Sequence, residues 1–382
     1  MFNFDEITNR SNTQCIKYDA LEKYFGDDNL QPFWVADMDF KTPDFVNDAI
    51  IKRAMHPIYG YAKVSQELLA SVQSWMKKRH NWEIQTHTIT FMNGVVPAYS
   101  AAIEAFSEIG DEVIVQTPVY FPLFNCVKHN KRNIVYNPLK ESNGYYTMDL
   151  EDLKSKITPK TKILALCSPH NPVGRVWDKS ELKKLAQICI EHDIKIISDE
   201  IHADLVFKTF TPMASISKKI ANITLTLSSA GKTFNIAGLN CSYSICSNKQ
   251  MQKRFEEIIH KREIHSVNVF GYAATQAAYE KGEKWVDNLL VYLKKNVQTV
   301  KKSLENTKIT FFEPEATYLL WLNFSCYNYT HNTIKKLLLE ESKVALNDGL
   351  SFGRNGAKHF RLNVAAPSSI LKQGLEKINR VF

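Results

Sequence analysis

Short apolar runs rich in β-branched residues alternate with helical segments between about residues 88 and 247. The first helical segment spaces Val95, Tyr99, Ile103 and Phe106 so that they fall on one helix face. Strands that are apolar almost throughout, and that are separated by helices, predict an α/β fold whose mainly parallel sheet is covered by helices on both faces. The predicted strands lie at 88–92, 111–116, 132–139, 161–168, 194–198, 222–228 and 241–247.

One helix in this region has a start signal. The helix predicted at about 178–192 opens with Asp178, and Glu181 follows three residues later. This spacing is that of a capping box, in which each side chain bonds the backbone N–H of the other residue, although Asp replaces the usual Ser or Thr. We therefore expect the helix to begin directly after Asp178.

The pattern changes toward the C-terminus. A long helix at 283–306 is followed by a strand-like run at 316–324, another helix, and a second strand-like run at 358–365. Helices interspersed with a few strands predict a smaller α+β domain. The N-terminal residues have weak periodicity and several aromatics, so we expect them to pack on that domain or on a second subunit. The predicted division is 1–45, 46–282 for the large domain, and 283–382 for the small one.

The composition indicates a globular chain of enzyme size. Of 382 residues, 44% are hydrophobic and 23% are charged, and this length favours two domains. No apolar run approaches the roughly 20 residues of a membrane span, and the N-terminus lacks a signal-peptide pattern. The seven cysteines include no CxxC pair, so a disulfide framework is not expected, and Cys167 and Cys189 fall at apolar positions. We therefore expect a cytoplasmic protein with no membrane partner.

The net charge of +8 raises the question of a nucleic-acid partner. The basic residues are spread along the chain, however, and the denser clusters at 77–80 and 260–265 are short. Neither a continuous basic stripe nor a recognised binding module accompanies the charge. We interpret it as a solvated basic surface with some attraction for small anions, and we expect no nucleic-acid partner.

Polar residues follow the predicted strands where each strand ends. In an open α/β sheet, ligands bind beyond the carboxyl ends of the strands, so these residues are the first candidates for a site. In chain order they are Asn93, Gly94, Val95, Tyr120, Asn171, Asp199, His202, Ser229 and Lys232.

Lys232 lies in "LSSAGKTFNIAG" and has no charged neighbour for several residues on either side. An amine at a strand end in apolar surroundings has its pKa lowered by desolvation, and a neutral amine can form a Schiff base with an aldehyde. The alternative is a solvated loop lysine, since lysine is mostly exposed. The neighbouring groups must decide between the two.

Asp199 closes the apolar run "IKIIS" and therefore falls at the ligand-facing rim of the sheet. A carboxylate there is suited to hold a proton on a heterocyclic nitrogen. The alternatives are an acidic loop, or a metal site in which Glu200, His202 and Asp204 alternate onto one face of an extended chain. No HExxH motif or second cluster supports a metal, and none is expected.

Gly94, Val95 and Val96 lie where a strand enters its helix. Free N–H groups at a helix start bind anions, although a tight turn would explain the glycine equally well. Ser229, three residues before Lys232, is placed to add a hydroxyl to the same anion. Tyr120 is suited to lie against an aromatic ring, or to be a core aromatic.

Asn171 and Arg361 complete the set. Asn171 in "PHNPVG" is suited to donate to a phenolic oxygen, and its alternative is a turn residue before proline. Arg361 is a charge on a strand otherwise rich in apolar residues. Its guanidinium suits a carboxylate ligand held in a bidentate fork, or a structural ion pair.

Taken together, "SPHNPVG", "SDEIHADLV", "SSAGKTFNIAGL" and "FRLNVA" resemble fold type I pyridoxal phosphate enzymes of the aminotransferase class I/II superfamily. The resemblance covers almost the whole chain, and the order Asn, Asp, Ser-x-x-Lys, Arg is more specific than any single motif. Within the superfamily, "PFWVADMDF" (32–40), "YGYA" (59–62) and "NGVVPA" (93–98) resemble the cystathionine β-lyase branch, the MalY/PatB-type C–S lyases.

The resemblance implies roles for the matching positions. Lys232 would bind pyridoxal 5′-phosphate as a Schiff base and later move the substrate's Cα proton. Asp199 would pair with the pyridine nitrogen, Asn171 would contact the ring's phenolic oxygen, and Tyr120 would stack on the ring as a further catalytic residue. The other implied cofactor contacts are Gly94, Val95, Val96, His202 and Ser229, together with Tyr61, which would reach the phosphate of the neighbouring subunit in a homodimer. The implied substrate contacts are Arg361 for the carboxylate, Asn171, and Ala36 and Asp37 of the 34–40 loop.

Two positions depart from the common aminotransferase pattern. Aminotransferases of this class commonly have a phosphate-binding arginine eight residues after the lysine, where this chain has Asn240. They also commonly have tyrosine three residues after the aspartate, where this chain has His202. Both departures favour a lyase over a standard aminotransferase.

The resemblance therefore implies β-elimination on L-cystathionine or a related L-cysteine S-conjugate, giving a thiol, pyruvate and ammonia. An aminotransferase acting on an L-amino acid is the alternative, since it shares the first steps. A third hypothesis is a binding or regulatory protein that holds the cofactor without turnover.

Overall fold

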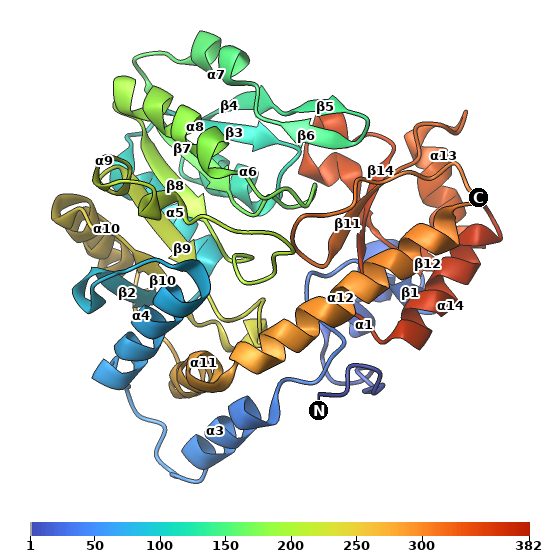
Figure 1. Ribbon diagram of the computed structural model, residues 1–382, viewed down its shortest axis with the longest axis horizontal. Coiled ribbons are helices and arrows are strands. Elements are labelled where there is room, and N and C mark those ends of the chain that lie inside the picture. Colours follow the sequence, from blue (N-terminus) through green and yellow to red (C-terminus); the bar gives the residue numbers. More distant parts are fainter. Residues whose placement is uncertain (1) are drawn as a thin grey trace.

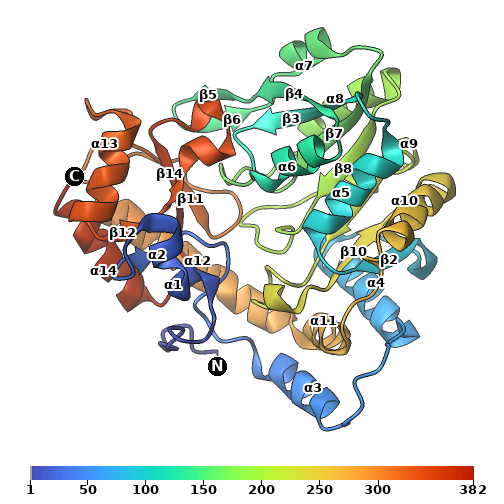
Figure 2. The ribbon, with the colours of Figure 1, turned by 180° about the vertical axis from the view of Figure 1, so that it is seen from behind.

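The computed structural model describes residues 2–382 and contains a central seven-stranded sheet (Figures 1 and 2). The strand order is β2-β10-β9-β8-β7-β3-β4, and only β10 runs antiparallel to its neighbours. The predicted mainly parallel sheet is confirmed. Its strands are β2 (Ile89–Met92), β3 (Glu112–Thr117), β4 (Asn133–Pro138), β7 (Thr161–Cys167), β8 (Lys195–Asp199), β9 (Thr224–Ser228) and β10 (Ser242–Ile245).

Helices cover both faces of this sheet, because apolar side chains alternate along each strand between two packing layers. In β3, Val113 and Val115 pack with α5 (Val95–Phe106), α6 (Pro122–His129) and α10 (Lys249–Lys261). The intervening Ile114 packs instead with α7 (Leu150–Lys156) and α8 (Lys179–Glu191). Cys167 and Cys189 are buried in these two layers, as their apolar positions predicted.

The start of α8 confirms the predicted capping box. The Asp178 side chain accepts hydrogen bonds from the N–H groups of Ser180 and Glu181, and Glu181 accepts the N–H of Asp178 at 2.9 Å. These bonds satisfy backbone groups that a helix N-terminus leaves without intrahelical partners.

The C-terminal region contains the predicted long helix, α12 (Glu283–Leu304), which runs from α11 (Val269–Lys281) past α14 (Ser368–Asn379) in both views (Figures 1 and 2). A three-stranded sheet of order β11-β14-β13 lies beside it. Its strands are β11 (Leu319–Asn323), β14 (His359–Asn363) and β13 (Asn347–Asp348).

The N-terminal segment is tied to this C-terminal region. Strand β1 (Gln31–Pro32) pairs in parallel with β12 (Val344–Ala345), and Phe33 packs in the same apolar cluster as Leu375 of α14. The remaining elements are α1 (Ile16–Asp19), α2 (Leu21–Phe25), α3 (Asp44–Ala54), α4 (Gln66–His80), α9 (Lys218–Ala221), α13 (His331–Lys336), β5 (Lys140–Ser142) and β6 (Tyr145–Thr147). Within residues 2–382, no helix combines the length and the apolar character needed to span a bilayer.

Candidate active site

The carboxyl ends of the parallel strands meet at a cavity of about 290 Å³. Most of the side chains that the sequence analysis took from separate strand ends line this one cavity. The predicted residues in its wall are Ala36, Asn93, Gly94, Val95, Val96, Tyr120, Asn171, Asp199, His202, Ser229 and Lys232. The amino end of β10 contributes Cys241 and Ser242 to the same wall.

Lys232 lies in the turn that follows β9, and its Nζ donates a hydrogen bond of 2.6 Å to the carbonyl of Ala36. Burial lowers the pKa of this amine to about 8, and the positive charge of Arg361 acts in the same direction. A lysine that lines a cavity with a lowered pKa is not a solvated loop residue. A fraction of this amine is therefore neutral and nucleophilic near neutral pH.

Asp199 ends β8 and is almost fully buried. Burial raises the pKa of its carboxyl to about 6, although the hydrogen bond that Oδ1 accepts from the N–H of Ile201, at 3.2 Å, and the charge of Lys232 act in the opposite direction. A cationic partner in the cavity would favour the ionised form. Asp199 is therefore suited to pair with a protonated ring nitrogen.

Glu200, His202 and Asp204 do not lie on one face of an extended chain, as the metal-site alternative required. Residues 201–204 form a turn rather than an extended chain. Glu200 accepts hydrogen bonds from Ser198 and from the N–H of Met213, whereas Asp204 accepts them from Trp75, His80 and Thr233. Within residues 2–382, no group of three or more His, Cys, Asp or Glu side chains is suited to hold a metal ion.

The start of α5 forms the anion-binding part of the cavity. Gly94 precedes the helix with a φ of 133°, a conformation that favours glycine, and has no side chain with which to cap the helix. Its N–H donates to the Ser242 hydroxyl at 3.0 Å, and the helix continues with Val95 and Val96. The Gly94 N–H is therefore engaged, and the backbone donors that the helix start offers to the cavity are those of Val95 and Val96, together with a favourable dipole.

Ser229 lies close to these donors, but its hydroxyl is already engaged. It donates to the Cys241 carbonyl at 2.6 Å and accepts from the N–H of Gly231 at 2.9 Å. To donate to a phosphate, the Ser229 proton would have to turn away from Cys241. Asn240, where aminotransferases commonly have arginine, is exposed and lines the same cavity.

Arg361 on β14 lies next to the cavity wall and is buried. Its Nη1 donates to Asn171 Oδ1 at 3.0 Å, and its Nη2 donates to the Trp34 carbonyl at 3.0 Å and to Asn347 Oδ1. Burial lowers its pKa to about 10. Among the described residues, no carboxylate pairs with this guanidinium and its Nε has no partner. A buried cation bonded only to neutral groups is suited to an incoming carboxylate.

His202 and Tyr120 complete the wall. His202 is buried, and burial holds its pKa well below the usual value. The imidazole is therefore neutral, and its buried Nδ1 has no partner among the described residues. Burial raises the pKa of Tyr120, so its phenol stays protonated, and its N–H donates to the Asn171 carbonyl at 3.1 Å.

Two predicted residues lie away from the cavity wall. Asp37 is not among the residues that line the cavity, and its carboxylate pairs with Arg10 at 2.6 Å. Tyr61 is fully exposed on the segment after α3, so its predicted role depends on a second subunit.

Residues 35–378 match the family described as Aminotransferase class I and II. The chain belongs to this family. It is 39% identical over 381 residues to cystathionine β-lyase PatB of Bacillus subtilis, with 98% of each chain covered. It is 32% identical over 383 residues to protein MalY of Escherichia coli, covering 98% of this chain and 97% of MalY.

A solved structure extends the likeness to three dimensions. The PLP-bound C–S lyase of Staphylococcus hominis, complexed with the inhibitor L-cycloserine, superimposes with a TM-score of 0.93 at 34% identity. The alignment covers 100% of this chain and 98% of that chain. The fold and family inferred from the motifs are thereby confirmed.

The polar groups fit the cofactor expected of this branch of the family. The helix start at Gly94 suits a phosphate, Asp199 suits a ring nitrogen, and the Lys232 amine suits an aldehyde. Buried His202, whose Nδ1 has no partner among the described residues, gives the wall a further polar group. An amine, a carboxyl group and backbone N–H donors thus lie in one cavity, and each suits a different part of pyridoxal phosphate.

Sequence reasoning missed Ser242 and Tyr318. Ser242 begins the antiparallel strand β10, so its amino end lies at the edge where the other strands have their carboxyl ends. Ser242 therefore begins its strand, whereas the site residues expected from this sheet were all predicted to follow theirs. The Tyr318 hydroxyl donates to the Ala36 carbonyl at 3.0 Å, and this contact across 282 positions of the chain has no local sequence signal.

Proposed function

We propose that the protein is a pyridoxal phosphate-dependent C–S β-lyase that cleaves L-cystathionine or a related L-cysteine S-conjugate. The products would be a thiol (homocysteine from cystathionine), pyruvate and ammonia. The observation that carries the proposal is the cavity in which the Lys232 amine, buried Asp199 and the α5 start meet beside unpaired Arg361. The lyase names of the relatives add support for elimination.

When bound, pyridoxal phosphate supplies an electron sink for bond cleavage at the substrate Cα and Cβ. Lys232 would hold the cofactor through its amine and then, once displaced by the substrate amine, take the proton from Cα. Its lowered pKa supports this role, because a base with a pKa of about 8 is partly unprotonated near neutral pH.

Asp199 and Arg361 would orient the reactants. Asp199, as a carboxylate, would keep a proton on the ring nitrogen and so maintain the electron demand of the ring. Arg361 would bind the substrate carboxylate. Asn171 accepts a hydrogen bond from Arg361 at 3.0 Å and would also contact the ring's phenolic oxygen, so that it would link Arg361 to the ring. Elimination is complete when the thiolate leaves Cβ, and water then releases pyruvate and ammonia from the remaining three-carbon fragment.

We also propose a cytoplasmic homodimer with shared active sites. The support is the surface around Tyr61, on which Ile51, Met55, Ile58 and Tyr59 are also exposed. An exposed group of large apolar side chains marks an interaction surface.

The test is to incubate the holoenzyme with L-cystathionine, without any keto acid, and to measure thiol and pyruvate. We expect equal amounts of both, and neither with Lys232→Ala, which should also lose the visible absorbance of the bound cofactor. Conversion of the cofactor to its pyridoxamine form without pyruvate would favour the aminotransferase alternative. Cofactor binding with no turnover of any amino acid tested would favour a binding protein.

A further inference from the structure

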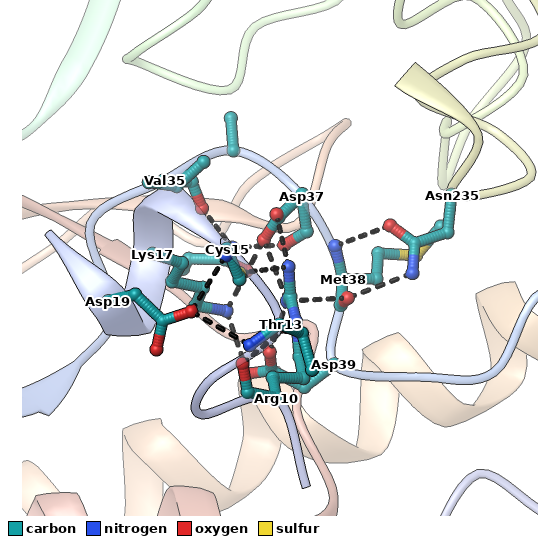
Figure 3. Close-up of polar contacts among 12 residues, drawn as sticks. Arg10, Thr13, Cys15, Lys17, Asp19, Val35, Asp37, Met38, Asp39 and Asn235 are labelled. Atoms are coloured by element: carbon teal, nitrogen blue, oxygen red, sulfur yellow. Dashed lines mark hydrogen bonds and ion pairs between the residues drawn. The ribbon is translucent and has the colours of Figure 1, made fainter. Parts of the chain in front are cut away.

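The segment 36–39 supplies the carbonyl that accepts the Lys232 hydrogen bond, and it has no regular secondary structure. Besides the Tyr318 hydroxyl, which donates to the Ala36 carbonyl at 3.0 Å, three sets of side chains hold it. Asn235, three residues after Lys232, accepts the Met38 N–H at 2.9 Å and donates to its carbonyl at 2.9 Å. Asn363 of β14 donates to the carbonyl of Asp37 at 2.6 Å. The third set comes from the N-terminal segment (Figure 3).

Arg10 bonds three consecutive residues of this segment (Figure 3). Its Nη2 lies 2.6 Å from Asp37 Oδ2, and its Nη1 lies 2.6 Å from Asp39 Oδ1 and 3.1 Å from the Met38 carbonyl. One planar guanidinium therefore fixes both the side chains and the backbone of 37–39, which a flexible ammonium group could not do as well.

Lys17 completes a four-membered ion cluster with Arg10, Asp37 and Asp39. Its side chain is fully buried, and its Nζ lies 2.7 Å from Asp39 Oδ2 and 3.7 Å from Asp37 Oδ1. Two cations thus balance two carboxylates: Lys17 and Asp39 are buried, whereas the side chains of Arg10 and Asp37 are 20% and 22% exposed. Removing Arg10 leaves two carboxylates facing one cation, and one of those carboxylates is buried.

The turn that carries Arg10 is itself ordered by local bonds. Asp19 of α1 accepts the N–H groups of Asn12, Thr13 and Cys15 at 2.8 to 3.0 Å. The Thr13 hydroxyl donates to the Arg10 carbonyl at 2.6 Å. This ordered N-terminal turn therefore holds Arg10 against residues 36–39.

We infer that Arg10 is a positioning residue of the active site: it holds residues 36–39, through Asp37 and Asp39, in the arrangement that presents the Ala36 carbonyl to Lys232. Its effect on the cofactor rests on the proposed function. Its effect on the segment does not, and the two can be measured separately.

The cluster also acts on the charge state of Lys232. The charged groups near this amine are Arg361 from β14, which lowers its pKa, and Asp37 and Asp199, which raise it, while nearby His202 is neutral. Arg10 offsets the negative charge of Asp37. Without Arg10, Asp37 would hold a proton on the Lys232 nitrogen more strongly, and without the Asp37 charge the proton would be held less strongly.

The first experiment measures hydrogen exchange of the peptide covering 35–40 in Arg10→Met, which keeps the length of the side chain but not its charge. We expect exchange faster by on the order of tenfold, because charge-assisted bonds to the segment are lost. Lys41→Ala is the matched control, since Lys41 pairs with Glu6 of the N-terminal segment at the surface. Hydrogen exchange of a peptide from the buried strand β7 is measured as well, because faster exchange there would indicate that the variant is destabilised globally. Equal exchange at 35–40 in Arg10→Met and wild type would overturn the inference.

The second experiment titrates the visible absorbance of the bound cofactor with pH. We expect the midpoint to rise in Arg10→Met and to fall in Asp37→Asn, by about half a pH unit each, with Arg10→Lys close to wild type. Shifts in the same direction would mean general loosening and would contradict the positioning role. If wild type shows no cofactor band, the proposed function fails, and the exchange result still decides the role of Arg10.

Discussion

Asp199 and Lys232 are ionisable groups that the fold buries. For each of them, the unfavourable desolvation of the charged form outweighs the stabilisation by neighbouring side chains. Asp199 has its pKa raised to about 6 and Lys232 has its pKa lowered to about 8, so both shifts disfavour the charged forms. Such paired shifts in one cavity are typical of a functional site rather than of a structural ion pair. The site is thus built from groups that destabilise the cofactor-free chain.

Asp199→Asn should make the cofactor-free protein more stable at pH 7. The folded pKa of the carboxyl lies above its unfolded value, so ionisation destabilises the folded state progressively from about pH 4 and to its full extent above about pH 6. The difference in free energy of unfolding should reach up to about 3 kcal/mol at pH 7 and vanish below about pH 4. Denaturant unfolding at both pH values measures it. A variant less stable than wild type at pH 7 would contradict the desolvation argument, while lyase activity should fall in any case.

At the scale of elements, apolar alternation and caps predicted most of the large domain. The strands appear within one or two residues of their predicted ranges, because every run except the edge strand β4 is largely buried. The direction of β10 did not follow from its sequence, since an apolar strand looks the same whichever way it runs. That direction brings Ser242 to the Gly94 N–H.

Asp178→Ala should lower the free energy of unfolding by about 1 kcal/mol, the usual cost of losing an N-cap side chain. Asp178 does not line the cavity, so the cofactor absorbance should be unchanged. Lys183→Ala, at an exposed position of the same helix, is the control. Equal unfolding midpoints for the two variants would show that the capping box does not stabilise α8.

At the scale of the whole molecule, one apolar cluster joins Phe33, α12 and α14, so the N-terminal residues fold with the C-terminal region. The division into 1–45, 46–282 and 283–382 stays a prediction. So does the homodimer, in which exposed Tyr61 would complete the site of the neighbouring subunit.

Mixing the inactive variants Tyr61→Ala and Lys232→Ala, after unfolding and refolding together, tests the shared site. Random pairing should give about a quarter of wild-type activity, because half of the dimers are hybrids and each hybrid has one intact site. Each variant refolded alone is the control. No recovery, with hybrids detected by mass, would place Tyr61 outside the neighbouring site.

The sequence by itself determined the α/β architecture, the capped helix and the strand-end positions of Asn171, Asp199, Ser229 and Lys232. Hydrophobic periodicity, apolar runs and the residues that follow them can all be read within a short stretch of the chain. Only the tertiary structure decided which long-range partners those residues have. Asp37 pairs with Arg10 of the N-terminal segment, Ser242 lies on an antiparallel strand, and Arg361 contacts Asn171 across 190 positions. Such contacts depend on how separate elements pack, and no local pattern encodes the distance between them.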